Sequence, residues 1–154
     1  MKKLLIFLMW VPCFYLSQKI ETGTFSELEY RQKQDRRPVI IHFYTDWCTV
    51  CKVETFRQNQ DKELVNRIND SFHMINFEAE KTKENIFFQG KEFTYVSNGS
   101  SGIHEIVLAL SRNKQQPVYP LWIILDAHLN LIYYHEGLWE PEEMKKKLNE
   151  LFVH

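Results

Sequence analysis

The sequence contains little cysteine and little glycine, and neither positive nor negative charge is in clear excess. It has three cysteines and five glycines among 154 residues, and its formal net charge is -1. Three cysteines are too few for a disulfide scaffold, which carries several bridges. The charge is balanced and no basic run is longer than Lys145–Lys147, so there is no electrostatic case for nucleic acid or an anionic membrane surface. We therefore expect no nucleic-acid partner.

Motifs for the common cofactors and nucleophiles are also missing. The chain has no glycine-rich dinucleotide fingerprint, no P-loop, no HExxH zinc motif and no GxSxG elbow, and it shows no internal repeat. Its composition is that of a globular protein, with 44% hydrophobic, 25% charged and 14% aromatic residues. Such a composition argues against disorder and is typical of one domain with its own core.

The one long apolar run lies at the N-terminus. Leu4–Leu16 follows two lysines and is interrupted only by Pro12. This run is too short for a comfortable membrane span and has the dimensions of a secretory signal. We expect residues 1–17 to be a cleaved signal peptide, and residues 18–154 to form a periplasmic or secreted domain without a stable membrane span. The alternatives are an uncleaved N-terminal anchor and a buried helix of a cytosolic protein.

The hydrophobic pattern predicts alternating helices and strands. The second predicted helix carries Val50, Val53 and Phe56 at three-residue spacing. Expected helices cover residues 24–35, 48–58, 61–68, 103–112 and 140–152. Expected strands cover residues 39–44, 72–77, 121–125 and 131–135, with a β-hairpin at 86–96 and a loop at 97–102.

Cleavage of the signal peptide would remove Cys13 and leave Cys48 and Cys51 as one pair at a strand-to-helix junction. The start of a helix stabilises a thiolate through unpaired N–H groups and the helix dipole. Cys51 lies one turn away and can attack a mixed disulfide formed at Cys48. A zinc site is an alternative, but it needs two further Cys or His ligands, and the histidines are scattered. A purely structural disulfide is the other alternative.

Two motifs together resemble the thioredoxin superfamily. One is the sequence Trp47–Lys52, which reads WCTVCK after an apolar strand, and the other is Tyr119-Pro120 before a second apolar strand. The first motif is similar to that of the C-terminal thioredoxin-like domains of DsbD disulfide reductases and of small exported bacterial thioredoxin-like proteins. The resemblance covers residues 38–152. It implies an α/β thioredoxin fold, with a central mixed β-sheet flanked by helices and a hairpin-plus-helix insertion at about 81–116 before the cis-proline strand.

The resemblance also implies roles for individual residues. Cys48 would be the exposed nucleophile and Cys51 the buried resolving thiol. Trp47, Tyr119 and Pro120 would contact the substrate. The family needs no bound cofactor or metal, so the expected partners are protein disulfide substrates and a membrane or periplasmic thiol that donates electrons.

Some positions depart from the thioredoxin pattern. His42 stands where thioredoxins commonly carry a buried aspartate, and it is either a possible proton relay for Cys51 or a hydrogen-bonded core residue. Thr49 and Val50 place no basic residue between the cysteines, which favours a reductase or electron relay over an oxidase. The sequence thus predicts an exported thiol–disulfide oxidoreductase.

A binding module is the main alternative to an enzyme. In that case the cysteine disulfide would be structural, and the aromatic residues of the insertion, Phe87, Phe88, Phe93 and Tyr95, would dock a partner. The same aromatic residues could instead cover a sheet edge or form a small satellite core. A metallochaperone is a further alternative.

Overall fold

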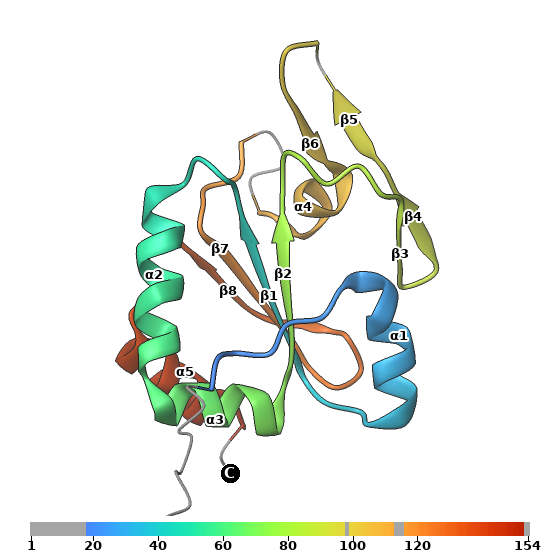
Figure 1. Cartoon of the computed structure of the whole chain (residues 1–154). Helices are drawn as coiled ribbons and strands as arrows, with labels where there is room; N and C mark the ends of the chain where they lie inside the picture. The colour runs from blue at the N-terminus through green and yellow to red at the C-terminus, as the bar shows by residue number, and fades with distance from the viewer. Residues whose placement is uncertain (1–17, 98, 113–115, 153–154) are drawn as a thin grey trace, which may run out of the picture.

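The computed structural model describes residues 18–97, 99–112 and 116–152 (Figure 1). A four-stranded mixed sheet has the order β2-β1-β7-β8, in which β1 and β2 are parallel and β7 runs antiparallel to β1 and β8. The helices are α1 (Phe25–Gln34), α2 (Thr49–Gln60), α3 (Lys62–Ser71), α4 (Glu105–Leu110) and α5 (Pro141–Phe152). The strands are β1 (Val39–Tyr44), β2 (His73–Glu78), β3 (Ile86–Phe88), β4 (Lys91–Phe93), β5 (Tyr95–Ser97), β6 (Gly102–His104), β7 (Leu121–Leu125) and β8 (Leu131–Glu136).

The central strand β1 separates two halves of the core. Successive side chains of a strand point to opposite faces. Ile41 and Phe43 pack with α1, α4 and the strands β3 and β4, whereas Ile40 packs with α3 and α5. Figure 1 shows α2, α3 and α5 on one side of the sheet and α1 on the other. His42 lies between Ile41 and Phe43 in the strand and points to the opposite face, so it faces the side that carries α2.

Two helices begin at the N-cap residues that the sequence indicates. Thr24 forms a capping box with Glu27 at the start of α1. Asp61 caps α3 by accepting a hydrogen bond from the Leu64 amide at 2.9 Å. Each cap satisfies donors that the first turn of a helix leaves free. The predicted order of elements and the mixed sheet flanked by helices are confirmed.

The helix α2 is confirmed, but its apolar residues do not form its buried face. Val50, Val53 and Phe56 are 47%, 42% and 66% exposed. The face that packs against the sheet is instead formed by Cys51, Glu54 and Gln58. The helix that follows Cys48 therefore buries a carboxylate and an amide, and these need partners in the core.

The insertion is more elaborate than the predicted hairpin and helix. It contains two hairpins, β3–β4 and β5–β6, followed by the short helix α4. Thr94 separates strand β4 from strand β5, and its amide and hydroxyl both donate to the Glu105 carboxylate. Residues 102–104 form a strand instead of the loop end and helix start that the sequence predicts, because the β5 backbone pairs with them. His104 then caps α4.

The aromatic residues of the insertion divide into two groups. Phe88 and Phe93 join the main core, and the Phe88 ring packs edge-on against Phe25 of α1 at 5.6 Å. Phe87 is 68% exposed. Two of the four aromatic residues, Phe88 and Phe93, therefore extend the core, as expected if the insertion covers the sheet or adds to the core.

The predicted signal peptide, residues 1–17 with Cys13, lies outside the described residues. Within the described ranges, none of the helices is both long enough and apolar enough to span a membrane.

Candidate redox site

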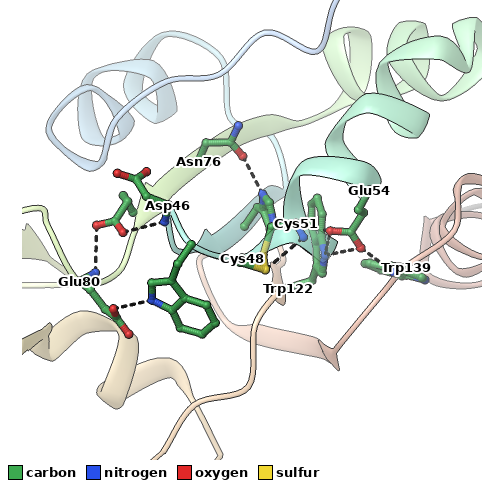
Figure 2. Close-up of a disulfide and its surroundings, with 11 residues drawn as sticks. Asp46, Cys48, Cys51, Glu54, Asn76, Glu80, Trp122 and Trp139 are labelled. Carbon is green, nitrogen blue, oxygen red and sulfur yellow. Dashed lines mark hydrogen bonds and ion pairs between the residues drawn. A yellow bond between two sulfur atoms is a disulfide. The ribbon is translucent and has the colours of Figure 1, made fainter.

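The cysteine pair lies where strand β1 meets helix α2. The strand ends at Tyr44, and a turn brings the chain to Cys48, the N-cap residue of α2. The Cys48 amide donates to the Thr45 carbonyl at 3.0 Å, which closes this turn. Cys48 and Cys51 are joined by a disulfide across the first turn of the helix, as Figure 2 shows.

The backbone at the start of α2 provides a donor for the Cys48 sulfur. The Cys51 amide lies 3.1 Å from Cys48 Sγ. In the reduced protein the same amide and the helix dipole would stabilise a Cys48 thiolate, which is the form that attacks disulfides. Cys48 is only 5% exposed and Cys51 2%. The expectation of an openly exposed Cys48 is thus wrong for the disulfide form, because the N-cap position holds the sulfur against the helix backbone.

Trp47 and Tyr119 come together from distant parts of the chain. Their rings are in edge-to-face contact, with centroids 6.2 Å apart. The Trp47 side chain is exposed, and its indole N–H donates to the Glu80 carboxylate at 2.8 Å (Figure 2). Trp47 is therefore held beside Cys48 by its contacts with Tyr119 and Glu80.

The Tyr119-Pro120 segment lies at the same end of the sheet as the cysteines. The peptide bond between Tyr119 and Pro120 is cis. Leu121, the next residue, is opposite Phe43 of β1. The Pro120 carbonyl accepts a hydrogen bond from the Gly137 amide at 2.8 Å, so this carbonyl is already engaged within the sheet. Contacts of Trp47, Tyr119 and Pro120 with a substrate remain predictions.

A groove of about 530 Å³ runs from Trp47 and Tyr119 to the insertion. One wall comes from the hairpin β5–β6, which shows that the insertion reaches the redox site. The residues that line the groove include Trp47, Glu80, Val96, Ile103, Val118 and Tyr119. Val96 and Val118 are 45% and 48% exposed, so apolar surface is open to solvent here.

Carboxylates dominate the charge beside this groove. Asp46 forms an ion pair with Lys81. Glu78 accepts hydrogen bonds from the backbone amides of Asp46, Glu80 and Lys81. Burial raises the pKa of Tyr119, and the negative charges of Glu80 and Glu78 raise it further. The surroundings of Trp47 therefore carry a negative potential.

His42 is buried directly beneath the redox site. It is 2% exposed and its ring stacks on Trp122, with centroids 4.1 Å apart. Its Nδ1 is 3.2 Å from Oδ1 of Asn76, whereas Nε2 has no hydrogen-bond partner. Burial lowers the pKa of His42 to about 4, although the Asn76 contact acts in the opposite direction. His42 and Cys51 both line a second pocket, of about 610 Å³, which also includes Asn76.

Glu54 completes this buried region and does not stand out in the sequence. Its carboxylate has no exposed surface and accepts hydrogen bonds from the Trp122 indole, at 3.2 Å, and from the Trp139 backbone amide. Figure 2 shows both donors converging on it. Oε2 of Glu54 lies 3.6 Å from Nε2 of His42. Burial raises the pKa of Glu54 to about 7 despite the two hydrogen bonds, which lower it.

A weak signal for Glu54 is present in the sequence. Residues 51, 54 and 58 share one helical face, so the face that contains Cys51 also contains Glu54. The neighbouring positions Val50, Val53 and Phe56 conceal this signal, because an apolar stripe normally marks the buried side of a helix.

The zinc alternative needs further ligands near the pair. In the part of the chain that the structure describes, there is no group of three or more His, Cys, Asp or Glu side chains placed to hold a metal ion.

The fold, the cysteine pair at a helix start and the adjoining cis-proline segment define a thioredoxin-type domain. The family model of the thioredoxin-like domain matches residues 26–152, so the chain belongs to this family. The predicted membership of the thioredoxin superfamily is thereby confirmed. A comparison with curated protein sequences gives no match.

Solved structures agree on the fold. The oxidoreductase DsbH is 16% identical and has a TM-score of 0.57, with 88% of this chain and 87% of DsbH covered. A thioredoxin from Thermus thermophilus is 16% identical with a TM-score of 0.58, covering 90% and 89%. Chloroplastic thioredoxin z is 13% identical with a TM-score of 0.53, covering 88% and 96%. At these identities the likeness establishes the thioredoxin fold.

Proposed function

We propose that this chain is an exported thiol–disulfide oxidoreductase that acts as a reductase or electron relay on protein disulfides. The observation that carries the proposal is the Cys48–Cys51 pair at the start of α2, where the Cys51 amide donates to the Cys48 sulfur. In the reduced protein this donor would stabilise the Cys48 thiolate. The family match and the oxidoreductase fold of DsbH support the same chemistry.

The cycle begins with the reduced pair. The Cys48 thiolate attacks one sulfur of a substrate disulfide, and the other substrate sulfur leaves as a thiolate. Cys51 then loses its proton and attacks Cys48 Sγ, so the mixed disulfide breaks and the second substrate thiolate leaves. Two electrons have passed to the substrate, and the protein holds the Cys48–Cys51 disulfide. A thiol donor returns two electrons to complete the cycle.

The groove beside Trp47 provides a place for the substrate chain. We expect an extended segment to lie against Tyr119 and Pro120 and to continue along β5–β6, where Val96 and Ile103 offer apolar contacts. The insertion would then contribute to the choice of substrate. Small disulfides would react without using this surface.

The charges around the pair support reduction over oxidation. A strong oxidant stabilises its reduced thiolate, often with a basic residue between the cysteines. Thr49 and Val50 supply no such charge. Glu78 and Glu80 place negative charge near Trp47, which disfavours a further anion. The measured reduction potential of the pair decides this direction.

Export rests on the sequence of residues 1–17, with its lysines and apolar run. The electron donor would then be a thiol protein in the membrane or the periplasm. An N-terminal anchor that is not cleaved would place the same domain at a membrane surface.

Covalent trapping tests the oxidoreductase. In Cys51→Ser the mixed disulfide cannot be resolved, so Cys48 should retain exported proteins that reductant releases. The matched control is Cys48→Ser, which keeps one cysteine but removes the nucleophile. If neither variant traps a protein and the wild-type disulfide resists mild reductant, the disulfide is structural and the binding module is favoured, with exposed Phe87 as its first candidate contact.

A further inference from the structure

The carboxylates beside Trp47 differ in how far their negative charge is compensated. Asp46 forms an ion pair with Lys81, and Glu78 accepts hydrogen bonds from three backbone amides. Glu80 accepts a hydrogen bond from the Trp47 indole through Oε2, at 2.8 Å (Figure 2). Among the residues that the structure describes, no lysine, arginine or histidine pairs with Glu80, and its Oε1 atom has no hydrogen-bond partner. Glu80 can therefore accept a cation from another molecule.

An exposed aromatic ring adjoins this carboxylate. Trp47 is 66% exposed, although its ring contacts Tyr119 edge-on and its N–H donates to Glu80. These two contacts orient the indole, and the open face of an indole attracts cations. Burial raises the pKa of Tyr119 and the charge of Glu80 raises it further, so its hydroxyl group stays neutral. That hydroxyl oxygen is buried and makes no hydrogen bond within the described ranges.

The chemistry of these groups matches a basic side chain. The guanidinium of arginine is planar, so it can stack on an aromatic ring while its N–H groups donate to a carboxylate. The ammonium of lysine supplies the same charge without a flat face. Negative charge at Glu80 and an open indole at Trp47 therefore favour arginine most, then lysine, over a neutral or acidic side chain.

The position of these groups links them to the reaction. Glu80 and Trp47 both line the groove, and Trp47 directly precedes Cys48 in the chain. A side chain bound between them would therefore belong to a residue close to the sulfur that Cys48 attacks. We propose that Glu80 and Trp47 form a subsite for an arginine or lysine side chain next to the reacting cysteine of the substrate.

This inference rests on the proposed function and adds the class of substrate. The subsite occupies the end of the groove at Trp47, whereas Val96 and Ile103 form an apolar wall on the hairpin β5–β6. The residues of the substrate that reach this wall would be apolar. The substrates are thus protein disulfides in which a basic residue adjoins one cysteine and apolar residues lie farther along the chain.

The test follows the reduced protein with model peptides that differ in one residue. Each peptide has one cysteine, in a mixed disulfide with the chromophore thionitrobenzoate, and arginine, citrulline or glutamate on one side of that cysteine or the other. The Cys48 thiolate attacks the peptide sulfur, the bond to thionitrobenzoate breaks, and the coloured thiolate leaves with the electron pair. Cys51 then displaces the peptide thiolate from Cys48. Citrulline has the shape of arginine without its charge, so this comparison isolates the charge.

In the wild type, the arginine peptide should react about fivefold or more faster than the citrulline peptide on at least one side of the cysteine. The glutamate peptide should be the slowest. Added salt should reduce the preference, because it screens exposed charges. In Glu80→Gln, whose amide oxygen can still accept from the Trp47 indole, the preference should fall below about twofold. Glu80→Lys should reverse the order of the arginine and glutamate peptides.

Glu143→Gln is the matched control, because it makes the same change of charge at an exposed position of α5. It should keep the wild-type preference, which separates a local effect of Glu80 from the net charge of the protein. Circular dichroism checks that each variant is folded. Should Glu80→Gln not fold, the wild-type preference and its dependence on salt decide the question without a variant.

Two results would overturn the inference. One is an equal rate for the arginine and citrulline peptides on both sides of the cysteine in the wild type. The other is a preference that persists in folded Glu80→Gln, because another group would then be its source. If the reduced wild type releases no thiol from any peptide or from the neutral disulfide dithiodipyridine, the proposed function itself fails. Normal release without a charge preference removes only the substrate class.

Discussion

The Glu54 carboxylate lies 3.6 Å from the His42 imidazole, at the centre of the side of the core that carries α2. Strand β1 supplies the imidazole and helix α2 supplies the carboxyl group, so the region beneath the cysteines contains a titratable acid even though β1 carries histidine. Because both groups are buried, their titration affects stability as well as chemistry.

Glu54→Gln should make stability less dependent on pH. The pKa of Glu54 rises from 4.5 to about 7 on folding, so the stability it contributes is present below the unfolded pKa and is lost as the pH rises through about 7. The variant should equal wild type at low pH and exceed it at pH 8 by on the order of 3 kcal/mol. Urea unfolding at several pH values measures this difference. Equal free energies of unfolding at pH 8 would contradict it.

Trp122→Phe should destabilise the protein more at pH 8 than at pH 5. The substitution removes the indole N–H that donates to Glu54, and an ionised carboxylate needs this donor more than a neutral one. We expect a loss of about 1–3 kcal/mol from the missing hydrogen bond at pH 8, in addition to the cost of the smaller side chain.

Trp139→Phe is the matched control for this experiment. Trp139 contacts Glu54 through its backbone amide, which the substitution leaves in place. Its destabilisation should therefore be similar at both pH values. A pH dependence as strong as that of Trp122→Phe would mean that the indole N–H is not the source of the effect.

Much of the fold could be predicted from local sequence. The apolar run of β1 is buried on both sides of the sheet, so its burial does not depend on distant detail. The structure of the insertion was harder to predict from the sequence. Its strands have three residues each, and the break at Thr94 depends on the carboxylate of Glu105, which only the folded chain brings near.

Some residues of the candidate site could also be predicted from the sequence, and others could not. Cys48, Cys51 and Tyr119-Pro120 belong to short motifs, and motifs are visible in a sequence. Glu54 is an ordinary helix residue until Trp122 and Trp139 converge on it from the other end of the chain. Glutamate is rarely fully buried without partners, so a sequence-based expectation places it in solvent.

Gly102→Ala should loosen the hairpin β5–β6. A Cβ atom at this position would lie 2.3 Å from the Tyr95 hydroxyl oxygen and 2.6 Å from the Val96 carbonyl oxygen. The tyrosine can move, but the backbone carbonyl belongs to the paired strand, so we expect a cost of about 1–3 kcal/mol. Faster amide exchange at Val96 and Ile103 would report the change. Gly90→Ala, in the turn between β3 and β4, separates local strain from this effect: nothing lies within 4 Å of its added Cβ, but its φ of +75° strains an alanine, so it should leave amide exchange at Val96 and Ile103 unchanged.

Val96→Asp should impair the reduction of protein disulfides but not of small ones. Val96 is 45% exposed and lines the groove that also contains Glu80, so an aspartate there removes apolar contact and adds negative charge. When the reduction of insulin disulfides is measured, we expect the rate to fall several-fold. The reaction with the small disulfide dithiobis(nitrobenzoate) should stay at the wild-type rate. Ile132→Asp, on the edge strand β8 and 38% exposed, is the control and should leave both activities unchanged. Equal loss of both activities in Val96→Asp would show that the substitution damages the cysteine pair itself. Wild-type activity toward insulin would show that substrates do not use the wall that the insertion provides.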